Sequence, residues 1–300
     1  MRIFSFLSFM VSSFVGALQV RGVEVIWGTV PPIFQGVPAY LLARLKRIPF
    51  VLEVRDLWPD FAIEVGVLKN PLVIWASRRL ERFLYHHADH IIVNSPGFIP
   101  HLRRCGVPEC KIDLVTNSVD VSMFDPEDRG EEVRRKWDLQ DKFVAIYAGA
   151  HGLANDLETV LLAAKRLEIY PEICFVLIGD GKERANLVNQ AEDLGLINVH
   201  FIPAQPKERM SSFLAAADVC IAILKDIPMF RTTYPNKVFD YMASGRPTVL
   251  AIDGVIREVV EKAEGGVFVQ PGSPGALAEA VLIYHQDIDL RLRHGRNSRS

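Results

Sequence analysis

The sequence has few cysteines, and their placement argues against two kinds of site. Only four occur in 300 residues. Cys105 and Cys110 lack the paired C-x-x-C spacing of a zinc site. Cys174 and Cys220 lie inside apolar runs, where cysteine is usually a small core residue. Disulfides and a cysteine-rich zinc site are therefore not expected, and a reducing, cytoplasmic compartment fits best.

Several other signatures are missing. The formal net charge of −2 gives no sign of the basic surface that nucleic-acid-binding proteins carry. We find no serine nucleophile elbow, Walker loop, repeat of solenoid length or low-complexity tract. About half of the residues (49%) are apolar, which is ample for a large core, and the length favours two domains.

One long apolar run lies at the N-terminus, IFSFLSFMVSSFVGALQV, after Arg2. It is marginal in length for a transmembrane helix and rich in serine. Val15-Gly16-Ala17 would also suit a signal peptidase. Because a strand-like run, Val23–Trp27, follows at once, we favour a helix packed on a sheet, with the signal peptide as the alternative.

Apolar, β-branched runs alternate with helical patterns along the chain, which predicts a parallel α/β architecture. The segment Phe124–Gly130, dense in Asp, Glu, Pro and Gly, is expected to be a linker, so we assign residues 1–126 and 127–300 to two domains. The strands expected in the first domain are Val23–Trp27, Phe50–Val54, His90–Val93 and Lys111–Val115. Those of the second are Phe143–Ala148, Cys174–Gly179, Val199–Ile202, Val219–Leu224, Thr248–Ala251 and Gly266–Val269. The second set suffices for a doubly wound sheet, whereas the first predicts a domain incomplete at its N-terminus.

The segment 230–250 holds a helix start with an excess of positive charge. Arg231 and Lys237 lie beside a helix N-terminus that is itself partly positive. This is unfavourable unless an anion binds there, and free N–H groups with two cations suit a diphosphate. Asp240 follows one turn later, on the face of Lys237 and Asn236, where it could accept hydrogen bonds from sugar hydroxyls. A surface helix with unremarkable charges is the alternative.

Ligands of parallel α/β sheets bind beyond the carboxyl ends of the strands. Four consecutive turns of the second domain carry glycine, amide or charged residues there. Their candidate site residues are Gly149, His151 and Gly152; Gly179, Asp180 and Gly181; Pro203, Ala204 and Gln205; and the segment 224–233. In the first domain, Arg55 and Asp56 follow a strand and could form a site rim, with a local ion pair as the alternative.

Two groups of residues have the chemistry of metal ligands. His86, His87, Asp89 and His90 straddle a helix end and a strand start, so their side chains should diverge. Asp287-Ile288-Asp289 resembles the Asp-x-Asp motif of some sugar-nucleotide enzymes but lies in a polar terminal helix. We therefore expect no metal and no cofactor.

A family resemblance runs through the whole chain in order. It is carried by FVLEVRDLWPD, ADHIIVNSPGFIPHL, KIDLVTNSVDVSMF, YAGAHGLANDLETVLLAA, LIGDGKER, FIPAQPKERM and FRTTYPNKVFDYMASGRPTVL. The chain resembles the retaining glycosyltransferases of family 4, in particular the branch with WbuB-type N-acetyl-fucosamine transferases. The resemblance implies a GT-B fold, in which two Rossmann-like domains face each other.

The resemblance also implies roles for the candidate residues. Gly149, His151 and Gly152 match the loop near the donor phosphates, and Gly179–Gly181 and Pro203–Gln205 match the turns around the base. Arg231 and Lys237 match the cations that hold the diphosphate, and Asp240 matches the acid that contacts the ribose. Arg55 and Asp56 match the position that faces the acceptor. Thr232 and Asp240 stand where the family has glutamates, and Asn236 where the branch has serine. Family members extend beyond both ends of this chain, so we expect a truncated protein.

The implied function is transfer of a sugar, with retention, from a nucleoside-diphosphate donor. The expected donor is a UDP-linked N-acetyl sugar, and the acceptor a lipid-linked saccharide of polysaccharide or O-antigen biosynthesis. The expected location is the inner face of the cell membrane, contacted by the apolar helix Phe4–Val20. A UDP-sugar 2-epimerase of the same fold and an inactive truncated nucleotide-sugar binder are the alternatives.

Overall fold

The computed structural model describes the backbone of residues 2–300 and the side chains from residue 8 onward. The chain forms two compact units. The first unit extends to Asn117 and includes Thr232–Tyr234, and the second unit comprises Ser118–Arg231 and Pro235–Ser300. The boundary thus precedes the expected one after residue 126. The cause is that the intervening segment packs on the second unit, where the Arg299 guanidinium donates to the carbonyl oxygen of Phe124 at 2.6 Å.

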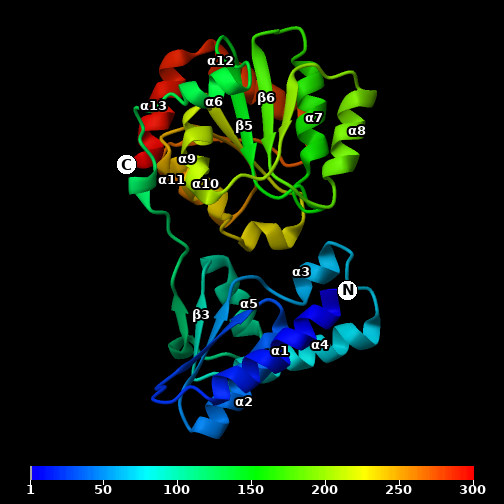
Figure 1. Cartoon of the computed structure of the whole chain (residues 1–300), viewed down its shortest axis with the longest axis vertical. Coiled ribbons are helices and arrows are strands. Elements are labelled where there is room, and N and C mark those ends of the chain that lie inside the picture. The colour runs from blue at the N-terminus through cyan, green and yellow to red at the C-terminus, as the bar shows by residue number, and fades with distance from the viewer. Residues whose placement is uncertain (1) are drawn as a thin grey trace. The chain divides into compact units, whose positions relative to one another are not determined.

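The first unit contains a parallel four-stranded sheet in the order β1-β2-β3-β4 (Figure 1). Its strands are β1 (Ile26–Val30), β2 (Phe50–Val54), β3 (His90–Val93) and β4 (Ile112–Leu114), and its helices are α1 (Arg2–Leu18), α2 (Gly36–Lys46), α3 (Asp60–Glu64), α4 (Pro71–His87) and α5 (Ile99–Arg104). The expected strand at Val23–Trp27 was wrong in its bounds. Pairing with β2 sets the start of β1, because Ile26 lies opposite Phe50, the first residue of β2.

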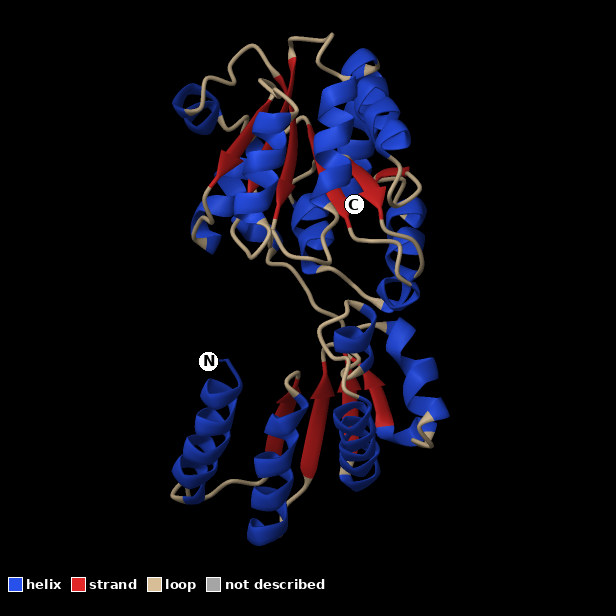
Figure 2. Ribbon diagram, turned by 90° about the vertical axis from the view of Figure 1, so that its right-hand side faces the viewer, coloured by secondary structure: helices blue, strands red, loops and turns tan. Residues whose placement is uncertain are grey.

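The second unit contains a parallel six-stranded sheet in the order β10-β9-β8-β5-β6-β7. Its strands are β5 (Phe143–Ala148), β6 (Ile173–Ile178), β7 (Val199–Ile202), β8 (Val219–Ile223), β9 (Thr248–Ala251) and β10 (Gly266–Phe268). Its helices are α6 (Glu131–Lys136), α7 (Leu157–Arg166), α8 (Arg184–Asp193), α9 (Lys207–Ala215), α10 (Asn236–Ala243), α11 (Val255–Lys262), α12 (Pro274–Gln286) and α13 (Ile288–Arg299). The strand order reverses between β5 and β8, and helices cover both faces (Figure 2). The doubly wound fold is thereby confirmed.

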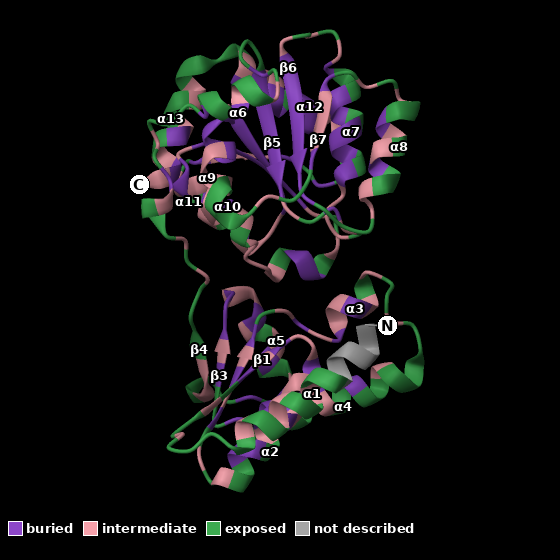
Figure 3. Cartoon of the chain, viewed as in Figure 1, coloured by how far each residue is buried: buried purple, intermediate pink, exposed green. Residues whose placement is uncertain are grey.

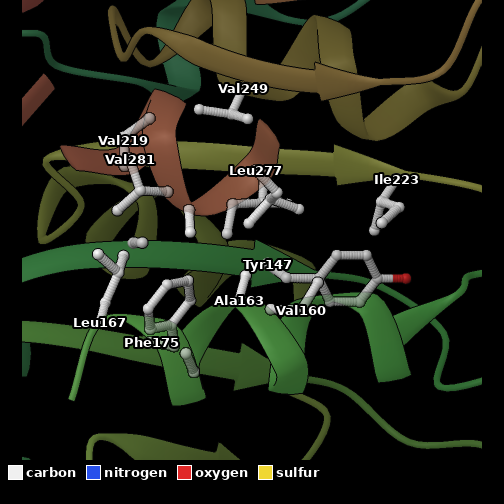
Figure 4. Close-up of a cluster of buried hydrophobic side chains, with 14 of the residues drawn as sticks. Tyr147, Val160, Ala163, Leu167, Phe175, Val219, Ile223, Val249, Leu277 and Val281 are labelled. Atoms are coloured by element: carbon white, nitrogen blue, oxygen red, sulfur yellow. The ribbon is translucent and has the colours of Figure 1, made fainter. Parts of the chain in front are cut away.

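The core of the second unit explains the long apolar strands. Every residue of β5 and β6 is buried, as strands covered on both faces must be (Figure 3). Val160 of α7 and Leu277 of α12 pack on this sheet (Figure 4). Tyr147 of β5 has its ring in the same cluster, and its hydroxyl group emerges toward the carboxyl edge of the strand.

The N-terminal helix α1 makes its main contacts with α2 and the turn Ile33–Gln35, not with the sheet as expected. Lys46 Nζ of α2 donates to the carbonyl oxygen of Val20 at 2.7 Å, and this bond links the segment after α1 to α2. Apolar side chains on α1 remain exposed, Phe9 at 55%. No helix among the described residues is both long and apolar enough to cross a membrane.

Candidate functional site

A cavity of about 390 Å³ lies at the carboxyl edge of the second sheet. The turns after β5, β6 and β7 form its wall, together with α9 and α10. The predicted site residues that line it are Gly149, Gly179, Asp180, Ala204, Gln205, Lys237 and Asp240. A second cavity of about 360 Å³ shares Gln205, Met210 and Asp240 with the first and is also lined by Asn236 and Lys207. The place is the switch point of the sheet, where doubly wound folds bind their ligands.

Two glycines allow the turns after β5 and β6 to meet. A Cβ atom on Gly179 would lie 1.8 Å from the carbonyl oxygen of Gly149, so the two backbones touch. Both glycines have positive φ, +150° at Gly179 and +155° at Gly149. A Cβ atom on Gly149 would lie 2.9 Å from Lys237 Nζ. The absence of a side chain at Gly149 therefore makes room for this ammonium group.

Lys237 is the central cation of the cavity wall. Its Nζ donates to the Tyr147 hydroxyl at 2.8 Å and to Asn155 Oδ1 at 3.4 Å, and it lies 4.1 Å from the centre of the Tyr147 ring. No carboxylate of residues 8–300 pairs with it. Burial lowers the pKa of Lys237 to about 7. An anion entering the cavity would supply the missing counter-charge.

Two tyrosines that the sequence analysis did not single out hold this arrangement together. The Tyr147 hydroxyl accepts from Lys237 and donates to the carbonyl oxygen of Ala150 at 2.8 Å. The Tyr241 hydroxyl of α10 accepts from the Ala148 N–H at 2.9 Å and donates to the Ala148 carbonyl oxygen at 3.2 Å. The bonds of Tyr147 with Lys237 and of Tyr241 with Ala148 join β5 to α10. Their partners are about ninety residues apart in sequence, so no local pattern could indicate them.

Asp240 lies one turn after Lys237 on α10 and lines both cavities. Burial raises the pKa of its carboxyl group, and the positive charge of Lys207 opposes that shift. Its oxygens can accept hydrogen bonds from hydroxyl groups of a ligand that spans the two cavities.

His151 is fully buried beneath the turn after β5 and does not line the cavity. The backbone N–H of His151 donates to the Asp180 carbonyl oxygen at 2.8 Å, and the backbone carbonyl oxygen of His151 accepts from the Glu183 N–H at 3.0 Å. Its ring nitrogens have no hydrogen-bond partner within the described part of the chain. Burial, with a smaller effect of Arg184, lowers the pKa of His151 to about 4, so the ring is neutral. His151 positions the two turns.

The remaining candidates of the second unit lie around the cavity rather than in its wall. Gly152 lines a different hollow, with Lys225. A Cβ atom on Gly181 would lie 2.2 Å from the His151 carbonyl oxygen, so this glycine permits close packing. The Pro203 carbonyl oxygen accepts from Gln205 Nε2 at 2.9 Å.

Arg231 differs from Lys237 in being paired with acids. Its guanidinium group donates to Asp226 Oδ1 at 3.1 Å, lies 4.0 Å from Asp253 Oδ2, and is half exposed. It precedes α10 in the chain and is separated from that helix by the segment Thr232–Tyr234, which belongs to the first unit. Within residues 8–300, the excess of positive charge inferred at the helix start is thus reduced to one cation without an acidic partner, Lys237.

Arg55 and Asp56 follow β2 in the first unit. No salt bridge joins them among the described residues, although a local ion pair was the alternative reading. Burial raises the pKa of Asp56 to about 6, against the opposing charge of Arg55. A carboxyl group with this pKa can exchange protons near neutrality.

Side chains of the histidine-rich group have separate partners, as its place across a helix end and a strand start predicted. His87 Nδ1 lies 2.8 Å from the Phe83 carbonyl oxygen, and His90 Nδ1 lies 3.1 Å from Asp113 Oδ2. Asp89 instead accepts from the Phe50 N–H at 2.8 Å. Asp287 caps α13 by accepting from the Leu290 N–H at 2.8 Å.

Comparisons with known proteins agree with this architecture. A curated relative is "Putative colanic acid biosynthesis glycosyl transferase WcaI" of Escherichia coli K12, 27% identical over 91% of this chain and 70% of its own. Another is a D-inositol 3-phosphate glycosyltransferase of Corynebacterium urealyticum, 27% identical over 72% of this chain and 53% of its own. The solved structure of Anabaena Alr3699/HepE with UDP and glucose is similar in fold, with a TM-score of 0.80, 18% identity, and coverage of 97% of this chain and 76% of that one.

The chain thus spans between about half and 70% of the length of these two relatives. The fold comparison confirms the GT-B class. The family described as "Glycosyl transferase 4-like domain" matches residues 4–118. "Glycosyl transferases group 1" matches residues 130–300, more than half of the chain. The chain belongs to this family of glycosyl transferases.

Proposed function

We propose that the chain transfers a sugar from a nucleoside-diphosphate donor bound in the second unit, in polysaccharide or glycolipid biosynthesis. The observation that carries the proposal is Lys237, a half-buried lysine whose amine is held by two neutral oxygens beside glycine turns. A diphosphate would supply the negative charge that these neutral partners lack.

The chemistry requires stabilisation of a leaving group. The bond from the anomeric carbon to a diphosphate oxygen breaks, and negative charge develops on the diphosphate. A bond from that carbon to an acceptor hydroxyl oxygen forms, and the hydroxyl proton passes to an oxygen of the departing diphosphate. A fixed ammonium group stabilises this charge without a metal. Lys237 is placed to do so, because a bound diphosphate would raise its pKa and keep it protonated.

The finer assignments belong to the same proposal. We infer UDP as the leaving group, supported by the likeness to HepE, which was solved with UDP. Asp240 would accept hydrogen bonds from the ribose, since it lies between the two cavities. The donor sugar is an N-acetyl hexose derivative, transferred with retention to a lipid-linked saccharide as in the WbuB-like branch.

The test replaces Lys237 by alanine. We expect a loss of about 2–4 kcal/mol of transition-state stabilisation, roughly a 30- to 1,000-fold lower kcat/KM. UDP release is measured from UDP-linked N-acetyl sugars with bacterial membranes as the source of acceptor, and the Kd for UDP by calorimetry. Lys262→Ala, at an exposed position of α11, is the matched control. Unchanged kinetics and UDP binding in Lys237→Ala would refute the assignment.

Product analysis separates the two alternatives. An epimerase converts the UDP-sugar in the absence of any acceptor, and an inactive binder gives a calorimetric signal without product. Transfer of radiolabelled sugar into a lipid-soluble fraction is the outcome expected from a transferase.

Contact with the inner membrane surface is also proposed. The exposed apolar side chains of the first unit include Phe9 on α1 and Trp75 on α4, the latter 62% exposed. The exposed Arg79 lies one turn after Trp75 and suits an anionic lipid surface. The Phe4 and Phe6 side chains of the expected contact lie outside the described residues.

We predict that Phe9→Ser with Trp75→Ser reduces co-sedimentation with vesicles containing anionic lipid. The reason is that both changes remove apolar area available to the bilayer interface. Ile197→Ser, at a position 90% exposed in the second unit, is the control and should bind like the parent chain. Equal sedimentation of all three proteins would count against this surface.

A further inference from the structure

Three side chains of metal-binding type meet in the first unit. Glu81 of α4, His101 of α5 and Cys105, the residue immediately after α5, each bring one ligand atom to within 4.8 Å of the others. His101 Nε2 lies 2.8 Å from Glu81 Oε1 and 3.6 Å from Cys105 Sγ. Glu81 lies twenty residues before His101 in the sequence, and none of the three residues has a part in the proposed sugar transfer.

Helical spacing places two of the ligands on one side of α5. His101 and Cys105 are four residues apart, so their side chains project from the same helix face one turn apart. The same i, i+4 spacing serves paired zinc ligands on helices. Glu81 reaches them from the neighbouring helix α4 and is only 3% exposed.

The hydrogen bonds of this cluster cannot all be made at once. His101 Nε2 faces both the Glu81 carboxylate and the Cys105 sulfur, yet a ring nitrogen carries at most one proton. When that proton is donated to Glu81, Nε2 cannot accept a hydrogen bond from the thiol. A cation between the three atoms would satisfy carboxylate, imidazole and thiolate together.

The other side of the imidazole ring is also suited to a metal ligand. His101 Nδ1 lies 3.8 Å from Asp60 Oδ2, and Arg78 donates to the other oxygen of Asp60 at 3.2 Å. A carboxylate beside the distal nitrogen orients ligating histidines in many metal sites. Asp60 cannot reach the same ion, because it lies on the Nδ1 side of the ring.

We infer that Glu81, His101 and Cys105 form a site for one zinc-type ion, with water as a fourth ligand. The set of thiolate, imidazole and carboxylate selects zinc or cobalt over magnesium or calcium. The ion would join α4 to α5, a structural role. The alternative to a metal ion is a proton on His101. Burial lowers the pKa of His101, but hydrogen bonds with Cys105 and Glu81 outweigh this effect and raise the pKa to about 10. A protonated His101 would form an ion pair with Glu81.

Cobalt(II) titration of the chelator-treated full chain tests the site. We expect one equivalent to bind and to produce a near-ultraviolet thiolate-to-cobalt charge-transfer band, which zinc then abolishes by displacement. Cys105→Ser should lose the band and bind at least tenfold more weakly. Cys110→Ser, at a nearby exposed cysteine, is the matched control and should titrate like the parent chain. Binding should strengthen as pH rises, because the ion displaces protons.

Glu81→Gln distinguishes metal binding from the ion pair alone. It keeps the size of a buried side chain and removes the charge, and circular dichroism reports whether the chain remains folded. Weaker cobalt binding by folded Glu81→Gln supports the site. Absence of a thiolate band in the folded parent chain, or an equal band in Cys105→Ser, overturns it. Because the readout is metal binding, the result is independent of the proposed sugar transfer.

Discussion

Lys237 illustrates what a single residue contributes to this protein. Its neighbours at hydrogen-bond distance, the Tyr147 phenol and the Asn155 amide, offer dipoles rather than charge. Burial therefore destabilises the ammonium form and favours the neutral amine. A bound diphosphate would reverse that balance, which makes binding and protonation interdependent.

At this scale we predict that donor affinity depends on pH. The pKa of Lys237 is about 7 in the free protein and higher in the complex, so the complex binds more protons between these values. Affinity for a UDP-sugar should be constant below the free-state pKa and fall by up to about tenfold per pH unit above it. A sugar-linked diphosphate has no second ionisation near neutrality that would confuse the result.

Calorimetric titration of a UDP-sugar from about pH 6 to pH 9 measures this dependence. Lys237→Arg is the control, because a guanidinium group stays charged throughout this range and should give a flat profile. A flat profile for the parent chain as well would contradict the proposed coupling.

The sequence predicted some individual residues of the site better than others. Lys237 could be identified because positive charge at a helix start is unfavourable without an anion. The same argument selected Arg231, which instead pairs with Asp226. Tyr147 and Asn155 gave no signal, since each meets Lys237 only after the sheet has formed.

At the scale of elements, the turns after β5 and β6 depend on close backbone contact. We predict that Gly179→Ala lowers the thermal stability of the second unit, because its Cβ would lie 1.8 Å from a backbone oxygen at positive φ. Such strain costs on the order of 1–3 kcal/mol. Gly149→Ala should lower the stability less than Gly179→Ala does, since the nearest neighbour of its Cβ is the flexible end of Lys237. It should nevertheless weaken UDP binding, because the added methyl group displaces the Lys237 amine.

Scanning calorimetry and UDP titration of the two variants check the order of these effects. Gly195→Ala is a control for alanine at a positive φ, because no atom lies within 4 Å of its added Cβ. If Gly149→Ala unfolded the protein while Gly179→Ala bound UDP normally, the described packing would be wrong.

The elements themselves were largely predictable from the sequence. The bounds of β5, β7 and β9 agree with the expected runs, because buried parallel strands are continuous apolar stretches between turns. The start of β1 was misplaced, because Val23–Val25 look like strand residues but lie before the pairing with β2. The Glu81–His101–Cys105 cluster was not anticipated, because the packing of α4 against α5 is a tertiary contact.

At the scale of the whole molecule, the division into two units includes a short segment that no change in amino-acid composition indicates. Thr232–Tyr234 belong to the first unit although their neighbours on both sides belong to the second. Ser95 Oγ donates to the Thr232 carbonyl oxygen at 2.5 Å, and a Cβ atom on Gly97 would lie 2.4 Å from that oxygen. Three residues are too short a segment for sequence patterns to assign.

At the same scale we predict two thermal transitions that respond to different ligands. Each unit has its own sheet, so unfolding need not be a single cooperative event. A ligand stabilises only the unit that binds it, by about 2.7 kcal/mol at a hundredfold excess over Kd. UDP should raise the transition of the second unit and zinc that of the first. Lys237→Ala and Cys105→Ser should each remove one response; a shift of both transitions by either ligand would argue against separate sites.

The low pKa of Lys237 also makes it a nucleophile. A neutral amine attacks activated esters and aldehydes at a pH at which ordinary lysines are protected by their charge. Acylation of the protein near neutrality should therefore occur preferentially at this position, and a bound donor would shield it. The Lys237 amine, which we infer stabilises the leaving diphosphate, would then also be an attachment site for a covalent inhibitor or a spectroscopic label.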